Sequence, residues 1–290
     1  MLNIIYNPIA GGKNGKKMKK AVSLIEKCLN GKKIEYAMHP TEYKGHAKEL
    51  TKNLTENGAT TIIVVGGDGT LHEVINGFTN FDKCSLGLIP CGTGNDFASV
   101  LNLPKDPIKA LELILTGEPK YTDFMQLPTV RGINVVGMGI DVDVLNRYEK
   151  LKKKTKLGYT KCLIKTLFDF NYVDFTAEID GEKTDYRSFI ACIANGNAYG
   201  GGIPICPPAN PTDETLNFLA VREIKKSKII GAFFKLKAGK VLTLKQSEHK
   251  TAKAIKITTQ NPYTINVDGE LYHDIPFEVK VVSNTLKMYR

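Results

Sequence analysis

From residue 1 to about residue 120, the chain alternates between two hydrophobic periods, and this alternation narrows its possible folds more than any other feature. Short apolar runs such as residues 2–6 and 61–65 read as buried strands, and apolar residues at helical spacing follow each of them. One helical stretch ends at Gly31, and Asp106 with Pro107 forms the pair that typically starts another helix. Repeated strand and helix units predict a parallel sheet covered by helices.

After about Tyr121 the pattern changes to short strands separated by turn residues, so the second half is expected to be largely β. The expected strands cover residues 175–179, 186–194, 216–221, 254–258, 263–267 and 277–282. Two turns, EIDGEKTD and NVDGELYHD, share an Asp-Gly pair that favours a tight hairpin. A lysine-rich and partly helical stretch is expected between them, at about residues 225–250.

The net charge of +10 favours a polyanionic partner, although a lysine-rich surface kept for solubility explains it equally well. The six cysteines contain no CxxC pair, so they are expected to be reduced and mostly buried thiols of a cytoplasmic protein. The N-terminal residues lack the pattern of a signal peptide, and no apolar segment reaches the roughly 18 residues of a transmembrane helix. Any membrane contact is therefore expected to be peripheral.

The stretch VVGGDGTLHEVING at residues 64–77 places three glycines around Asp68, directly after a buried strand. It fits neither the dinucleotide fingerprint nor the nucleoside-triphosphate P-loop. A glycine turn between a strand and a helix still favours a phosphate, because unpaired backbone N–H groups face it. Thr70 and Glu73 have the spacing of a capping box. Asp68 would repel a phosphate unless a cation lay between them, which suggests Mg²⁺ with a nucleotide.

A second turn, LGLIPCGTGNDFA at residues 86–98, repeats this arrangement of strand, glycines, hydroxyl and helix. The carboxyl ends of successive parallel strands lie at one edge of the sheet, where an open α/β sheet binds its ligand. The two turns are therefore expected to converge on one site.

Seven segments in this order resemble the diacylglycerol kinase catalytic family, which includes bacterial lipid kinases and sphingosine kinases. They are NPIAGG (7–12), GGDGTLHEVINGF (66–78), IPCGTGNDFA (89–98), GMGIDVDV (137–144), ANGNAYGGG (194–202), PPANPTDETLNF (207–218) and NVDGE (266–270). The resemblance implies a Rossmann-like α/β domain at residues 1–122 and a β-sandwich-like domain at 123–290. It further implies an active site in the cleft between the domains. The last strand is expected to pack back toward the first domain.

The same resemblance assigns roles to individual residues. The residues that would bind ATP and its Mg²⁺ are Asn7, Pro8, Gly11, Thr41, Gly66, Gly67, Gly69, Thr70, Glu73, Gly92, Thr93, Asn95 and Asp96. Asp68, Asp123 and Glu270 would be catalytic, with Glu270 as the general base. The local sequence does not distinguish Glu270 from Glu182, which follows the other Asp-Gly pair.

Two segments depart from the family pattern. Ile9 and Ala10 stand where hydroxyl residues are usual, so backbone amides would bind more of the phosphate. The structural metal loop keeps one matching carboxylate, Asp213, and Asn210 and Thr215 would add carbonyl oxygens.

Taken together, these features predict an ATP- and Mg²⁺-dependent lipid kinase that phosphorylates the hydroxyl of diacylglycerol or a related lipid. The expected partner is a lipid at an anionic membrane surface, contacted by lysine clusters at residues 150–156 and 225–240. Nucleic acid is not expected, and a homodimer stays open. Two alternatives remain: a soluble kinase of the NAD-kinase type, and a nucleotide-binding regulatory protein without turnover.

Overall fold

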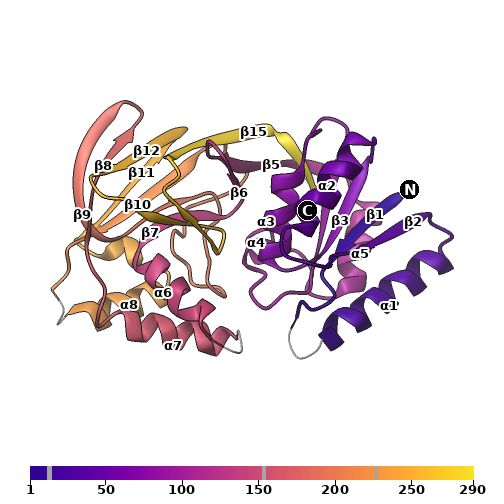
Figure 1. Ribbon diagram of the computed structural model, residues 1–290, viewed down its shortest axis with the longest axis horizontal. Helices are drawn as coiled ribbons and strands as arrows, with labels where there is room; N and C mark the ends of the chain where they lie inside the picture. The colour runs from indigo at the N-terminus through magenta and orange to yellow at the C-terminus, as the bar shows by residue number, and fades with distance from the viewer. Residues whose placement is uncertain (12–14, 152–154, 226–227) are drawn as a thin grey trace. The chain divides into compact units, whose positions relative to one another are not determined.

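The structure is a computed structural model that describes residues 1–11, 15–151, 155–225 and 228–290, and it divides into two compact units (Figure 1). The first unit comprises Met1–Asp123 and Ser283–Arg290, and the second comprises Phe124–Val282. Each unit has a hydrophobic core of its own. The chain therefore passes from the first unit to the second and returns for its last eight residues.

The first unit is a parallel sheet with helices. Its strands are β1 (Leu2–Tyr6), β2 (Tyr36–Pro40), β3 (Thr61–Gly66), β4 (Ser85–Pro90) and the final part of β15 (Phe277–Tyr289), in the order β15-β4-β3-β1-β2. Its helices are α1 (Lys16–Gly31), α2 (His46–Glu56), α3 (Asp68–Gly77), α4 (Asp96–Val100) and α5 (Pro107–Thr116). All four strand pairs are parallel, so the predicted α/β architecture is confirmed.

Helices cover both faces of this sheet. All six residues of β3 are buried, as expected for a strand covered on both sides. Ile63 and Val65 share a core with apolar residues of α1 and α5. Because side chains alternate along a strand, Ile62 and Val64 point to the opposite face, where α2 and α3 pack on each other.

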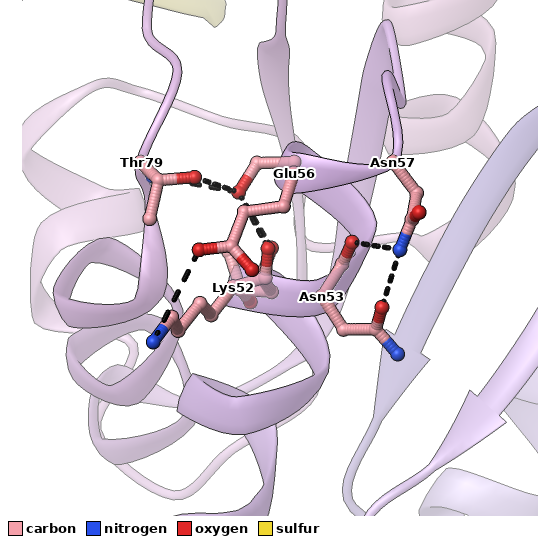
Figure 2. A network of polar contacts seen from close by, with 7 residues as sticks. Lys52, Asn53, Glu56, Asn57 and Thr79 are labelled. Atoms are coloured by element: carbon pink, nitrogen blue, oxygen red, sulfur yellow. Dashed lines mark hydrogen bonds and ion pairs between the residues drawn. The ribbon is translucent and has the colours of Figure 1, made fainter.

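Helices α2 and α3 are also joined through polar contacts. Figure 2 shows the last turns of α2, where the Asn57 side-chain amide donates to the Asn53 carbonyl oxygen at 2.8 Å. The hydroxyl oxygens of Thr55 and Thr79 are 2.8 Å apart, which ties α2 to the segment that follows α3. The two helices therefore form one layer on this face of the sheet.

The second unit is mainly antiparallel β structure. Its strands are β5 (Pro119–Gln126, which begins in the first unit), β6 (Arg131–Gly132), β7 (Val135–Gly139), β8 (Val173–Ile179), β9 (Glu182–Ala194), β10 (Leu216–Arg222), β11 (Ser247–Ala252), β12 (Ala254–Thr259), β13 (Thr264–Val267), β14 (Glu270–His273) and the first part of β15. Its helices are α6 (Ile140–Glu149), α7 (Lys156–Thr166), α8 (Ile229–Lys237) and the short 3₁₀ helix η3 (Val241–Thr243).

The long strand β9 organises this unit, because it pairs with β7, β8 and β10. Its residues alternate between two cores: Ala191 and Ile193 face a core between strands, while Ile190 and Cys192 face helices α6, α7 and α8. The strands that the sequence predicts in this region are confirmed for β8, β9, β10, β12 and β13. This arrangement also confirms the expected β-sandwich-like second half.

Helices α6 and α7 were not predicted from the sequence. The IDVDV run at the start of α6 alternates apolar and acidic residues, which is not the spacing of an amphipathic helix. All six cysteines are free thiols and five of them are buried, as expected. Among the described residues, no helix is long and apolar enough to cross a membrane.

Candidate functional site

Three turns lie at the carboxyl edge of the parallel sheet in the first unit. The first turn (residues 7–11) follows β1, the second (66–70) lies at the end of β3 and the start of α3, and the third (91–96) follows β4. Thr41 follows β2 at the same edge, with its amide donating to the Tyr6 carbonyl oxygen at 2.9 Å. The sheet therefore collects most of the predicted nucleotide-binding residues in one place.

The second and third turns are in direct contact. The amides of Cys91 and Gly92 both donate to the Gly66 carbonyl oxygen, at 2.7 and 3.1 Å. A methyl group added to Gly67 would lie 2.9 Å from the Gly92 Cα atom, so the two backbones meet where no side chain fits. The predicted convergence of these turns is confirmed, and the glycines are required by the contact itself.

The first turn joins this contact. Gly11 has φ of +82°, and a methyl group there would lie 2.5 Å from the Cys91 carbonyl oxygen. The Asn7 side-chain oxygen accepts the Ile9 amide at 3.1 Å, while its carbonyl accepts the Ala10 amide at 3.1 Å. Asn7 and Pro8 thus begin a turn built largely by backbone groups, without the hydroxyl side chains usual in the family.

Asp68 connects the second turn to the third. Its Oδ1 atom accepts the Phe97 amide at 3.2 Å, at the N-terminus of α4. A methyl group at Gly94 would lie 2.7 Å from Asp68 Oδ2 and 3.5 Å from Asp96 Oδ2, so both carboxylates adjoin this glycine. Burial and the nearby Asp96 charge raise the pKa of Asp68 to about 6. This hydrogen bond ties Asp68 to the N-terminus of α4, and the Mg²⁺ predicted beside Asp68 stays a prediction.

The capping box predicted for Thr70 and Glu73 is wrong. Helix α3 begins at Asp68 with Gly67 as its N-cap, and Leu71 donates the first helical hydrogen bond to the Gly67 carbonyl oxygen. The Glu73 carboxylate instead accepts the Gly45 amide at 2.8 Å and the Ala47 amide at 3.1 Å. Glu73 therefore caps α2, and its role toward a nucleotide stays a prediction.

The remaining nucleotide-site residues of the first unit differ in exposure. Thr93 and Gly69 are both exposed, so a ligand in solvent can contact them. Asn95 has φ of +56° and bonds reciprocally with Gly92, accepting its amide at 2.8 Å and donating to its carbonyl at 3.1 Å. Asp123, the last residue of the N-terminal segment of this unit, is 2% exposed and lies in β5.

In the second unit, both Asp-Gly pairs form the predicted tight hairpins. Asp180 and Gly181 connect β8 to β9, and Asp268 and Gly269 connect β13 to β14, all four with positive φ. The first hairpin ends at Glu182, whose side chain is 83% exposed and lies 3.9 Å from the Lys250 amine. The second ends at Glu270, which is half-buried.

The surroundings of the two hairpins distinguish Glu270 from Glu182, which the local sequence does not. Asp268 accepts three backbone amides, from Ile133 at 2.7 Å, Asn134 at 2.8 Å and Val135 at 3.1 Å. These bonds fix the second hairpin to the start of β7, whereas Glu182 lies on an exposed hairpin. The sequence analysis missed Asp268, because identical Asp-Gly letters carry no information about a partner more than 130 residues away. The role of Glu270 as the base stays a prediction.

The predicted metal loop is an exposed turn stabilised by its own side chains. Asp213 Oδ1 accepts the Thr215 amide at 3.1 Å and the Thr215 hydroxyl at 2.9 Å, and Thr212 donates to Asn210 Oδ1 at 2.9 Å. Within residues 1–11, 15–151, 155–225 and 228–290, no three acidic, histidine or cysteine side chains cluster as metal ligands. Metal binding at this loop therefore stays a prediction with a single carboxylate behind it.

Comparisons with known proteins agree with this geometry. Residues 1–127 match the family model of the diacylglycerol kinase catalytic domain, and residues 134–290 match that of the YegS C-terminal NAD kinase beta sandwich-like domain. A Bacillus subtilis protein named "Putative lipid kinase YtlR" is 27% identical, with 98% of this chain and 97% of that protein aligned. A Staphylococcus epidermidis protein named "Putative lipid kinase" is 27% identical over 91% of this chain and 89% of its own length.

Solved structures show the same two-part fold. The crystal structure of a "putative diacylglycerol kinase" from Bacillus anthracis superposes with a TM-score of 0.81 at 25% identity, covering 99% of this chain and 96% of that one. An NAD kinase from Archaeoglobus fulgidus in complex with ATP superposes with a TM-score of 0.58 at 13% identity, covering 100% of this chain and 94% of that one. The second similarity extends to the fold alone.

Proposed function

The chain belongs to the diacylglycerol kinase catalytic family, and on that basis we propose that it is a lipid kinase that transfers the γ-phosphoryl group of ATP to a lipid hydroxyl. The proposed binding of ATP rests on one observation, the contact of three turns at one edge of the sheet. These turns follow strands at the carboxyl edge of the sheet, and backbone N–H groups at the N-terminus of the helix that follows such a turn suit a phosphate. Diacylglycerol or a related lipid is the proposed acceptor.

Each part of the chain has a separate task in this proposal. The glycine turns, with Asn7, Thr41 and Thr93, would hold the triphosphate, and ATP with its Mg²⁺ would supply the phosphoryl group. Asp68 and Asp96 present two carboxylates beside Gly94, a hard-oxygen donor set of the kind Mg²⁺ accepts. Glu270 would accept the proton of the attacking hydroxyl, and phosphoryl transfer asks little more of the protein than positioning and charge neutralisation.

A lipid acceptor is supported by helices α7 and α8 of the second unit. Leu157, Lys161, Ile164, Lys165 and Phe168 share the solvent face of α7 and its C-terminal extension at spacings of three, four and seven residues. Phe168 is 60% exposed. Large apolar side chains alternating with lysines on an exposed helix face suit a membrane interface with anionic lipids.

Helix α8 repeats this arrangement. Ile230 and Phe234 are 52% and 65% exposed, with Lys235 and Lys237 beside them. Beneath both helices, apolar side chains including Leu163, Leu167 and Phe233 line a small cavity of about 30 Å³. Lys152, Lys153, Lys154 and Lys226 of the predicted lysine clusters lie outside the described residues. We propose peripheral docking of this helical face on an anionic membrane.

The test combines labelled ATP with vesicles that contain diacylglycerol, phosphatidylglycerol, sphingosine, ceramide or undecaprenol, with NAD as a soluble acceptor. We expect label in one lipid and none in NAD. Glu270→Gln should lower turnover at least about 100-fold because the base is lost. Glu182→Gln is the matched control on the other Asp-Gly hairpin and should retain wild-type turnover.

Three results would contradict parts of this proposal. Phosphorylation of NAD without vesicles would favour a soluble NAD-kinase-type enzyme. ATP binding without transfer to any acceptor would favour a regulatory protein. Full activity in Glu270→Gln with loss in Glu182→Gln would reverse the assignment of the base.

A further inference from the structure

Asp141 is a buried carboxylate that the proposed mechanism does not use. It lies in the first turn of α6 and is 3% exposed. Its Oδ2 atom accepts the Asn266 side-chain amide at 3.2 Å, and its Oδ1 atom accepts no hydrogen bond within the described residues. Burial raises the pKa of Asp141 to about 7, although the Asn266 amide favours its charged form. Such a group is costly to retain in a folded protein.

The space for this carboxylate is provided by the strand that Asn266 pairs with. Gly137 of β7 lies opposite Asn266 of β13 in the antiparallel register. A methyl group on Gly137 would lie 2.2 Å from Asp141 Oδ2. Glycine at this position is therefore what allows Asp141 to reach Asn266 beneath the sheet.

Asn266 carries the contact onward to the hairpin of Glu270. Its side-chain oxygen accepts the Gly269 amide at 2.7 Å, and Gly269 directly precedes Glu270. Because one amide group both donates to Asp141 and accepts from Gly269, Asp141 sets the orientation in which Asn266 holds the turn. We propose that Asp141 is a positioning residue that acts through Asn266 and the Gly269 amide to fix the Glu270 carboxylate.

The other hairpin of the same sequence type shows that this contact is not needed to form such a turn. Asp180 and Gly181 also have positive φ, and the exposed hairpin that they form pairs Ile179 with Glu182. The contact with Asp141 therefore contributes to where the Glu270 hairpin lies and is not needed for the hairpin to form. Errors of about 1 Å in the placement of a reacting group can lower a rate about 100-fold.

The experiment compares two substitutions of Asp141 in the whole chain. Asp141→Leu removes the oxygen that accepts the Asn266 amide, whereas Asp141→Asn keeps a side-chain oxygen that can accept it and is the conservative variant. Asp143→Asn, on the same first turn of α6, is the matched control. Gly137→Ala is a second variant, which displaces the carboxylate without removing it.

Three measurements are made on each variant. The first is kcat and the KM for ATP with the lipid that the protein phosphorylates, which rests on the proposed function. The second is the ¹H–¹⁵N chemical shift of the Gly269 amide, which reports its hydrogen bond to Asn266. This second measurement needs no turnover, so it still tests the positioning role if no acceptor is phosphorylated. The third is thermal unfolding, which reports whether each variant folds.

We expect Asp141→Leu and Gly137→Ala to lower kcat about 10- to 100-fold with an unchanged KM for ATP. Asp141→Leu should also shift the Gly269 amide signal, because Asn266 loses the partner that orients its side chain. Asp141→Asn should retain both values, and Asp143→Asn should match wild type. An unmoved Gly269 amide signal in a folded Asp141→Leu protein would overturn the proposal, as would an Asp141→Asn protein that loses both values.

Discussion

At the scale of single residues, Asp68 shows how one carboxylate can connect two turns. Its Oδ1 atom accepts a hydrogen bond from the N-terminus of α4, while its Oδ2 atom lies beside Gly94, close to the second carboxylate of Asp96. Burial, and then the charge of the nearby Asp96, raises the pKa of Asp68 to about 6. The ionised form of Asp68 is therefore disfavoured in this setting.

The raised pKa of Asp68 predicts that the free energy of unfolding depends on pH. The pKa of Asp68 is higher in the folded protein than in the unfolded chain, so the folded state binds more protons between about pH 4 and 6. The contribution of Asp68 to the free energy of unfolding is fully present below about pH 4 and is lost as the pH rises through 6. Asp68→Asn lacks the titration. Its free energy of unfolding relative to wild type should rise by about 1–3 kcal/mol across this window.

Urea unfolding of wild type and Asp68→Asn at pH 4, 5, 6 and 7 measures this difference. A constant difference across the series would show that the ionised Asp68 carries no net penalty in the fold. Asp106→Asn is a suitable control, because Asp106 caps α5 at the surface by accepting the Ile108 and Lys109 amides at 3.0 Å.

At the scale of elements, the sequence predicted those features whose causes are local. Asp106 and Pro107 predicted the start of α5, and both Asp-Gly pairs predicted their hairpins, because capping and turn geometry depend on adjacent residues. The capping box at Glu73 failed, since the amides it binds lie 26 and 28 residues earlier in the chain.

The same distinction applies to the candidate site. The glycine turns were found because strand, turn and helix follow one another in the sequence. The anchoring of Asp268 to residues 133–135 and the contact between Asp141 and Asn266 were not found. Both join segments more than 120 residues apart, so only the folded chain brings their atoms together.

The exposed faces of α7 and α8 give a prediction at this scale. Phe234→Ser should weaken binding to phosphatidylglycerol vesicles about 10- to 100-fold, because a Phe side chain loses roughly 1.5–3 kcal/mol of burial when it no longer inserts. Leu24→Ser, which changes an exposed apolar residue on α1, is the matched control and should bind like wild type. Vesicle sedimentation at several salt concentrations measures both. Equal weakening by the two substitutions would argue against a specific docking face.

At the scale of the whole molecule, the chain builds two units that differ in sheet type and share two strands. β5 leaves the first unit, and β15 returns to it, so that Lys287 and Met288 pair in parallel with Ser85 and Leu86. Leu286 and Met288 are fully buried. Residues at the end of the sequence therefore complete the core of the unit that begins it.

This connection predicts an uneven response to a substitution in β15. Leu286→Ala should lower the free energy of unfolding by about 2–5 kcal/mol, the usual cost of truncating a buried leucine. The loss should be felt in the first unit, where this side chain lies. Hydrogen exchange should speed up in β3 and β4, while β8 and β9 should exchange as in wild type. Equal acceleration in all four strands would mean that the two units unfold together.

The returning strand also has a consequence for how the protein is made. Domains usually fold in order as a chain leaves the ribosome, the N-terminal one first. Here the parallel sheet that carries the glycine turns lacks its β15 edge until residues 283–288 have been synthesised. A product cut short by a premature stop would leave β4 without its neighbour and the turns on an incomplete sheet. The first unit thus completes its sheet only after the second unit has been synthesised.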